Sequence, residues 1–164
     1  MHTSCLIVVL SAVLVAGCVG EPAGPPFKPV ADVKTLMVTV IDPAADAVWE
    51  SVGMILDEHG VTEWAPETDE EWAAVASGAM TIAEGGNLLM IGARARDQDT
   101  WMRMAQGMID AGLAAYEAAQ SKDPDAIFDV GGVIYDACDR CHSVYWVGDE
   151  DRGRVRDENS QPNP

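Results

Sequence analysis

The sequence predicts an all-α fold, an antiparallel up-down-up-down four-helix bundle over residues 30–147. Four stretches repeat apolar residues every three or four positions, the spacing of one helix face. Helix-favouring residues dominate the composition and runs of β-branched residues are few. Short connections between four such helices favour antiparallel neighbours. The stretches lie at about 31–56, 68–93, 99–120 and 124–145.

The first helix is expected at 31–56 and contains Pro43. Proline removes a backbone donor and disfavours helix at the preceding residue, but the apolar stripe stays in phase across it. We therefore predict one kinked helix. The alternative is a fresh start with Asp42 as N-cap and Pro43 at the first helical position. Residues 57–66 are expected to be a connection, with the helical stretch stopping at His59-Gly60.

The second helix has a clear start signal. Thr68 and Glu71 match a capping box, in which each side chain accepts a hydrogen bond from the other residue's backbone. Gly85 and Gly86 weaken this helix locally. They also leave room for a flat ligand or a neighbouring helix to approach closely.

Asp97 or Asp99 is expected to cap the third helix, and Asp123-Pro124 opens the fourth with Asp as N-cap and Pro at the first helical position. Beyond the fourth helix, residues 148–164 are charged and polar, and we expect an acidic, disordered tail.

The N-terminal residues 1–17 are predicted to be a signal peptide. Residues 6–16 are apolar but too short to span a bilayer. Val15-Ala16-Gly17-Cys18 resembles a bacterial lipobox, which implies cleavage before Cys18 and lipid attachment to its thiol. Residues 1–4 depart from the pattern because they lack Lys and Arg; an ordinary secretory signal is the alternative. Residues 18–29 would form a flexible tether rich in Pro and Gly, so the domain is expected in the periplasm, anchored to a membrane.

The net charge is −17, from 27 acidic and 10 basic residues. This excludes a nucleic-acid partner, because phosphate binding needs a basic surface. It favours a strongly solvated surface and a basic partner, with solubility alone as the alternative.

The strongest motif is Cys138-Asp139-Arg140-Cys141-His142, which is typical of covalent haem c attachment. Positions i, i+3 and i+4 of a helix share a face, so both thiols can reach one edge of a porphyrin while His142 reaches its iron. A thioredoxin-like thiol pair, a structural zinc and a plain disulfide are the weaker alternatives. Tyr145 lies one turn further on and is a candidate to pack on the porphyrin or on His142.

The predicted topology also proposes a sixth ligand. The start of the first helix lies beside the end of the fourth in such a bundle, so Met37 and His142 are expected at the same end. Met37 is therefore a candidate iron ligand. The alternative is that it fills the core, as Met often does.

A helix bundle with this motif near its C-terminus resembles the cytochrome c′ family over about residues 31–146. The resemblance implies that a first-helix residue faces the vacant side of the iron: a ligating Met in low-spin members, and a non-ligating apolar residue in high-spin ones. Leu36-Met37 falls at that place. A homodimer through the first two helices is also an expectation of the resemblance. The early Pro43, and Lys34 in place of a basic residue at Val33, depart from the family pattern.

Function is expected to be one-electron transfer to exported redox proteins or membrane redox complexes, with iron held by His142 and Met37. Binding of a small gas such as NO or CO at an open sixth position is the alternative. A haem-free Cys-x-x-Cys thiol module is a third. No catalytic constellation is apparent in the sequence, so an enzyme is not expected.

Overall fold

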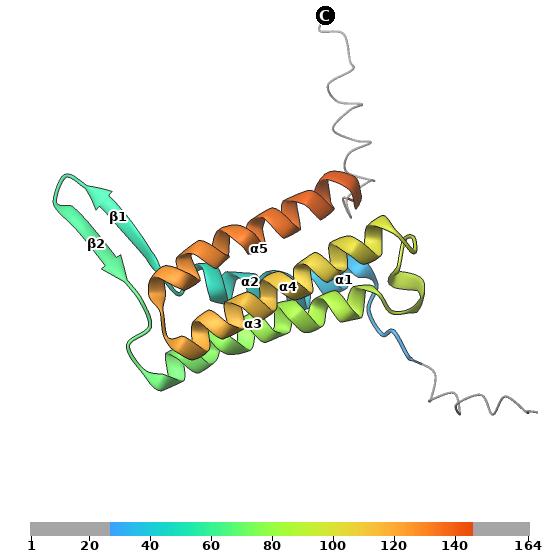
Figure 1. Ribbon diagram of the computed structural model, residues 1–164, viewed down its shortest axis with the longest axis horizontal. Coiled ribbons are helices and arrows are strands. Elements are labelled where there is room, and N and C mark those ends of the chain that lie inside the picture. Colours follow the sequence, from blue (N-terminus) through green and yellow to red (C-terminus); the bar gives the residue numbers. More distant parts are fainter. Residues whose placement is uncertain (1–26, 146–164) are drawn as a thin grey trace, which may run out of the picture.

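The structure, a computed structural model, describes residues 27–145, and most of them are helical. Four long helical segments lie side by side and alternate in direction along the chain (Figure 1). A two-stranded sheet projects from one end. Within residues 27–145, no helix combines the length and hydrophobicity needed to cross a bilayer. The elements are α1 Val33–Leu36, η1 Met37–Ile41, α2 Asp42–Trp49, β1 Gly53–Asp57, β2 Gly60–Trp64, α3 Asp69–Leu89, η2 Gly92–Arg94, α4 Thr100–Ser121 and α5 Pro124–Tyr145.

The first helical segment runs without a break through α1, η1 and α2, so the prediction of one helix across Pro43, and not two, is confirmed. The distortion lies just before the proline: η1 is a π-helix in which the N–H of Asp42 donates to the carbonyl of Met37. Pro43 has no N–H to continue the α-helical pattern, and the wider turn accommodates this loss.

The expected end of that helix is wrong. It stops at Trp49, and residues 53–64 form the antiparallel hairpin of β1 and β2. The prediction of an all-α fold is corrected accordingly. Gly60 has a φ of +125° at the turn, a conformation that favours glycine. At the base, the Trp64 ring covers Gly53, where an added Cβ would lie 2.2 Å from the ring.

The start signals of the later helices are confirmed. Thr68 and Glu71 form both bonds of the capping box. At the start of α4, Asp99 occupies the N-cap position, but the Asp97 carboxylate makes the side-chain bond, accepting from the N–H of Trp101 at 3.0 Å. Asp123 accepts from the backbone of the first turn of α5. The second helix ends at Leu89, before the expected position near residue 93.

Helices α3 and α4 approach very closely because glycines face the partner backbone. An added Cβ at Gly112 would lie 2.5 Å from the Ala83 nitrogen, and one at Gly86 would lie 2.7 Å from the Ala105 carbonyl oxygen. The suggestion that Gly85-Gly86 admits a neighbouring helix is therefore supported for α4. Small residues at this contact allow the backbones of α3 and α4 to pack densely.

The segment before α1 is fixed by a buried arginine. Arg94 in η2 donates from Nε to the Ala31 carbonyl at 3.0 Å and from Nη1 to the Leu88 carbonyl at 3.1 Å. The predicted signal peptide, Cys18, most of the tether and the tail at 148–164 lie outside the described residues.

Candidate functional site

A cavity of about 490 Å³ lies between the first helical segment, α4 and α5. Its volume falls within the range of small-molecule and cofactor pockets, roughly 300–1,000 Å³. Apolar side chains supply most of its lining. The residues that the sequence singled out, Met37, Cys138, Cys141 and His142, all contribute to this one cavity.

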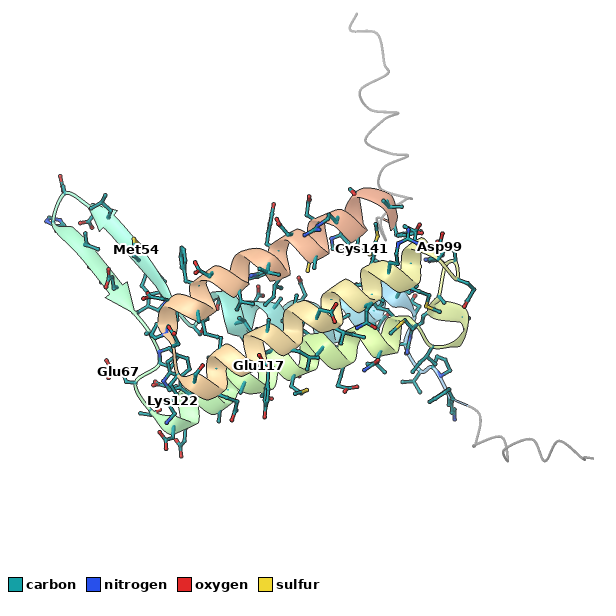
Figure 2. All side chains as sticks on the ribbon, in the orientation of Figure 1. Met54, Glu67, Asp99, Glu117, Lys122 and Cys141 are labelled. Carbon is teal, nitrogen blue, oxygen red and sulfur yellow. The ribbon has the colours of Figure 1, made fainter. Side chains whose placement is uncertain are left out.

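The Cys138–His142 motif lies in the last two turns of α5, as predicted. Cys138, Cys141 and His142 are half-buried, whereas Asp139 and Arg140 between them are exposed. Figure 2 labels Cys141 on the side of α5 that faces α4. Helical spacing thus directs the two sulfurs and the imidazole to the cavity together.

Burial raises the pKa of both thiols. For Cys138 desolvation is the largest cause, followed by the charges of Cys141 and Asp42; for Cys141 the cause is desolvation. A reactive redox thiol needs the opposite, a lowered pKa at a helix N-terminus or beside a cation. The environment of the pair is therefore unlike that of a thioredoxin-type site.

Met37 lies in η1 of the first helical segment and lines the same cavity as the motif on α5, the last helix. Met104 and Met108 of α4 line the same cavity, although neither was predicted to be a site residue. They belong to the apolar stripe of their helix, and spacing alone does not distinguish stripe residues at a cavity from those in the core. The site thus contains three thioethers, one of which was predicted as a ligand.

The polar groups at the cavity are few. Lys34, Asp42 and Asp139 contribute to its lining. Trp49 also lines it, and its indole Nε1 donates to the Gly131 carbonyl of α5 at 2.9 Å. That bond joins α2 to α5 and fixes the ring at the wall.

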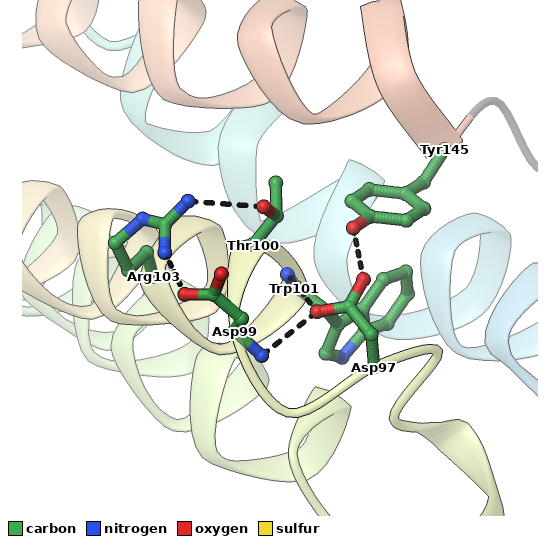
Figure 3. A network of polar contacts seen from close by, with 6 residues as sticks. All are labelled: Asp97, Asp99, Thr100, Trp101, Arg103 and Tyr145. Carbon is green, nitrogen blue, oxygen red and sulfur yellow. Dashed lines mark hydrogen bonds and ion pairs between the residues drawn. The ribbon is translucent and has the colours of Figure 1, made fainter.

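Tyr145 lies at the end of α5 but contacts the α3–α4 connection. Its hydroxyl donates to Asp97 (Figure 3). Its ring packs edge-on against the Trp101 ring, with the two ring centroids 5.1 Å apart. The bond from Tyr145 is the largest cause that lowers the pKa of Asp97, and the same bond raises the pKa of Tyr145. Tyr145 does not line the cavity, so its predicted contact with a porphyrin stays a prediction.

Among residues 27–145, no three or more His, Cys, Asp or Glu side chains form a group that could hold a metal ion on their own. Comparison with known proteins found no matching family model, no matching curated protein and no matching solved structure.

Proposed function

We propose that this chain is an exported one-electron carrier that holds a single, covalently attached haem c in the cavity between the first helical segment, α4 and α5. The observation that carries the proposal is the meeting of Cys138, Cys141 and His142 at one large apolar cavity. A Cys-x-x-Cys-His motif needs such a space beside it to admit a porphyrin. The residues present therefore fit the group.

Each protein residue has a role in this proposal. The two Cys thiols form the thioether links, and His142 provides the proximal nitrogen. Bound there, the haem supplies a metal centre that cycles between ferric and ferrous iron. Met37 is proposed as the sixth ligand, and a thioether at that position favours the reduced state. The apolar walls limit water around the site, which reduces solvent reorganisation on electron transfer.

The proposal includes the cytochrome c′-like arrangement of a four-helix bundle around this group. The side-by-side packing of alternating helices supports it (Figure 1). The hairpin is an addition to that arrangement. We also propose export by residues 1–17 and lipid attachment at Cys18, with redox proteins or membrane complexes of the periplasm as partners.

The first experiment is an absorption spectrum of the purified chain from a host that attaches haem c. We expect covalent haem that resists acid–acetone extraction. The Cys138→Ser, Cys141→Ser double variant should lack it. Covalent haem in the double variant, or none in the parent chain, would refute the proposal. His142→Ala should retain the links but change the spin state of the iron.

Methionine variants separate electron transfer from gas binding. If Met37 ligates the iron, the ferric protein shows a long-wavelength thioether-to-iron band, and carbon monoxide leaves the ferrous spectrum unchanged. Met37→Leu should abolish the band and admit carbon monoxide. Met104→Leu and Met108→Leu are matched controls, since both side chains line the same cavity. High-spin spectra with carbon monoxide binding in the parent chain would assign the site to gas binding.

A further inference from the structure

The β1–β2 hairpin projects from the helices (Figure 1). Large apolar side chains on it are exposed to solvent, among them Met54, which is labelled in Figure 2. Met54 is 59% exposed, Leu56 76% and Val61 60%. In the register of the hairpin Leu56 pairs with Val61, and Met54 lies two residues before Leu56 on the same face. These three side chains form one largely apolar face, which we call the hairpin face; Glu63, the cross-strand partner of Met54, lies on it too. Exposed apolar surface of this kind marks interaction sites.

The hairpin is also unsupported as a sheet. Each strand pairs only with the other, so both outer edges keep unpaired ladder groups. A lone two-stranded hairpin is marginally stable in water. One hydrogen bond from the hairpin to the helical body is made by the Trp64 indole, which donates to the Glu50 carbonyl at 3.0 Å. Exposed sheet edges of this type accept an added strand from a partner.

Charge is distributed very unevenly along the molecule. The half that carries the hairpin, residues 42–83 and 106–133, contains fifteen acidic residues and one basic residue, Lys122. That lysine is paired with Asp69 at 2.7 Å. The opposite half of the described chain, where the Cys138–His142 motif lies, has six acidic and six basic residues. The entire net charge of residues 27–145 is therefore at the hairpin end.

We propose that the hairpin face is a docking site for a protein partner that presents apolar side chains flanked by lysine and arginine. Charge complementarity selects this occupant, because the acidic half attracts basic surfaces over long range and the apolar face provides short-range contact. A second copy of the chain would bring two acidic halves together. An anionic membrane surface would be repelled for the same reason.

The inference does not depend on haem. The hairpin is formed by residues 53–64, and the Cys138–His142 motif lies at the other end of α5 (Figure 1). Failure of haem attachment would leave the docking proposal intact, and failure of docking would leave the haem proposal intact. If both hold, the partner is bound away from the end where the motif lies.

The test uses the full purified chain and a labelled short peptide of alternating lysine and leucine. We expect binding by fluorescence anisotropy that weakens as salt rises, and amide shifts in NMR spectra that concentrate in residues 53–64. Replacing both Leu56 and Val61 by serine should weaken binding at least tenfold, about 1.4 kcal/mol. Leu113→Ser is the matched control, an exposed leucine on α4 that should leave the affinity unchanged.

A second variant tests the charge. Asp57→Asn, Glu58→Gln and Glu63→Gln together remove three carboxylates from the hairpin and should both weaken binding and reduce its salt dependence. Peptide binding that ignores the Leu56 and Val61 substitutions would overturn the proposal. So would self-association in sedimentation that the same substitutions abolish, or hairpin-dependent binding to phosphatidylcholine vesicles. Unchanged thermal midpoints in all variants confirm that each remains folded.

Discussion

Two glycines on α4 should respond in opposite directions to the same added methyl group. A Cβ at Gly112 would lie 2.5 Å from the Ala83 nitrogen and 2.9 Å from the Ala79 carbonyl oxygen of α3. Both contacts are with backbone, which cannot rotate away. A Cβ at Gly107, on the same helix, would have no atom within 4 Å. Gly107→Ala is thus the control for Gly112→Ala.

The expected magnitudes follow from these contacts. Alanine is favoured over glycine inside a helix by about 0.5–1 kcal/mol, so Gly107→Ala should stabilise the protein by about that amount. Gly112→Ala gains the same term. It also forces α3 and α4 apart, and overpacking of a well-packed interface costs about 1–3 kcal/mol. We expect a net loss of about 1–2 kcal/mol, so the two variants should differ by about 2 kcal/mol.

Urea unfolding followed by circular dichroism measures both free energies, with haem content matched between samples. Gly112→Ala should lower the midpoint and Gly107→Ala should raise it. If Gly112→Ala proves as stable as Gly107→Ala, the close α3–α4 approach described above is wrong.

Three further predictions concern single side chains. Thr68→Ala removes one half of the capping box and should reduce the unfolding free energy by about 1 kcal/mol in the same urea assay, whereas Thr68→Ser should not. Tyr145→Phe should raise the pKa of Asp97 toward its ordinary value in an NMR titration, since the Tyr145 bond is the largest cause of its lowering. A lowered folded-state pKa contributes stability that is lost as the pH falls through it, so the variant should also depend less on pH in acid, and an unmoved pKa would contradict the bond. In the haem-free chain, Asp42→Asn should speed alkylation of Cys138 near neutral pH but leave the other thiol's rate unchanged, because the Asp42 charge contributes to raising the pKa of Cys138 alone.

Local signals in the sequence were sufficient for the helix starts. Thr68 with Glu71 and Asp123 before Pro124 are short-range patterns whose hydrogen bonds form within one turn. The hairpin was missed because the apolar run from Val52 to Leu56 also fits helical spacing. Gly53 and Gly60, which bound the strands, were the available signals.

In the candidate site, too, some residues were predictable from local patterns, whereas others depend on how the helices pack. The Cys138–His142 motif is local, and helical spacing alone directs it to one face. Met37 was placed by topology, since it needed the order and directions of four helices. Met104 and Asp42 were not identified as site residues because their approach to the cavity depends on how far apart the helices pack, which residue spacing does not encode.

Arg94 determines how a mechanical load would enter the domain. Its guanidinium joins the Ala31 carbonyl, ahead of α1, to the Leu88 carbonyl at the end of α3. Tension on the chain before Ala31 would therefore pass along two routes. One runs directly into α1, and the other runs through Arg94 into the end of α3, which packs against α4. If Cys18 anchors the chain to a membrane, pulling on the tether would load α3 as well as the short turn that precedes Met37. Because α1 would then carry only part of the load, a pull on the anchor would displace Met37 less than if α1 alone carried it.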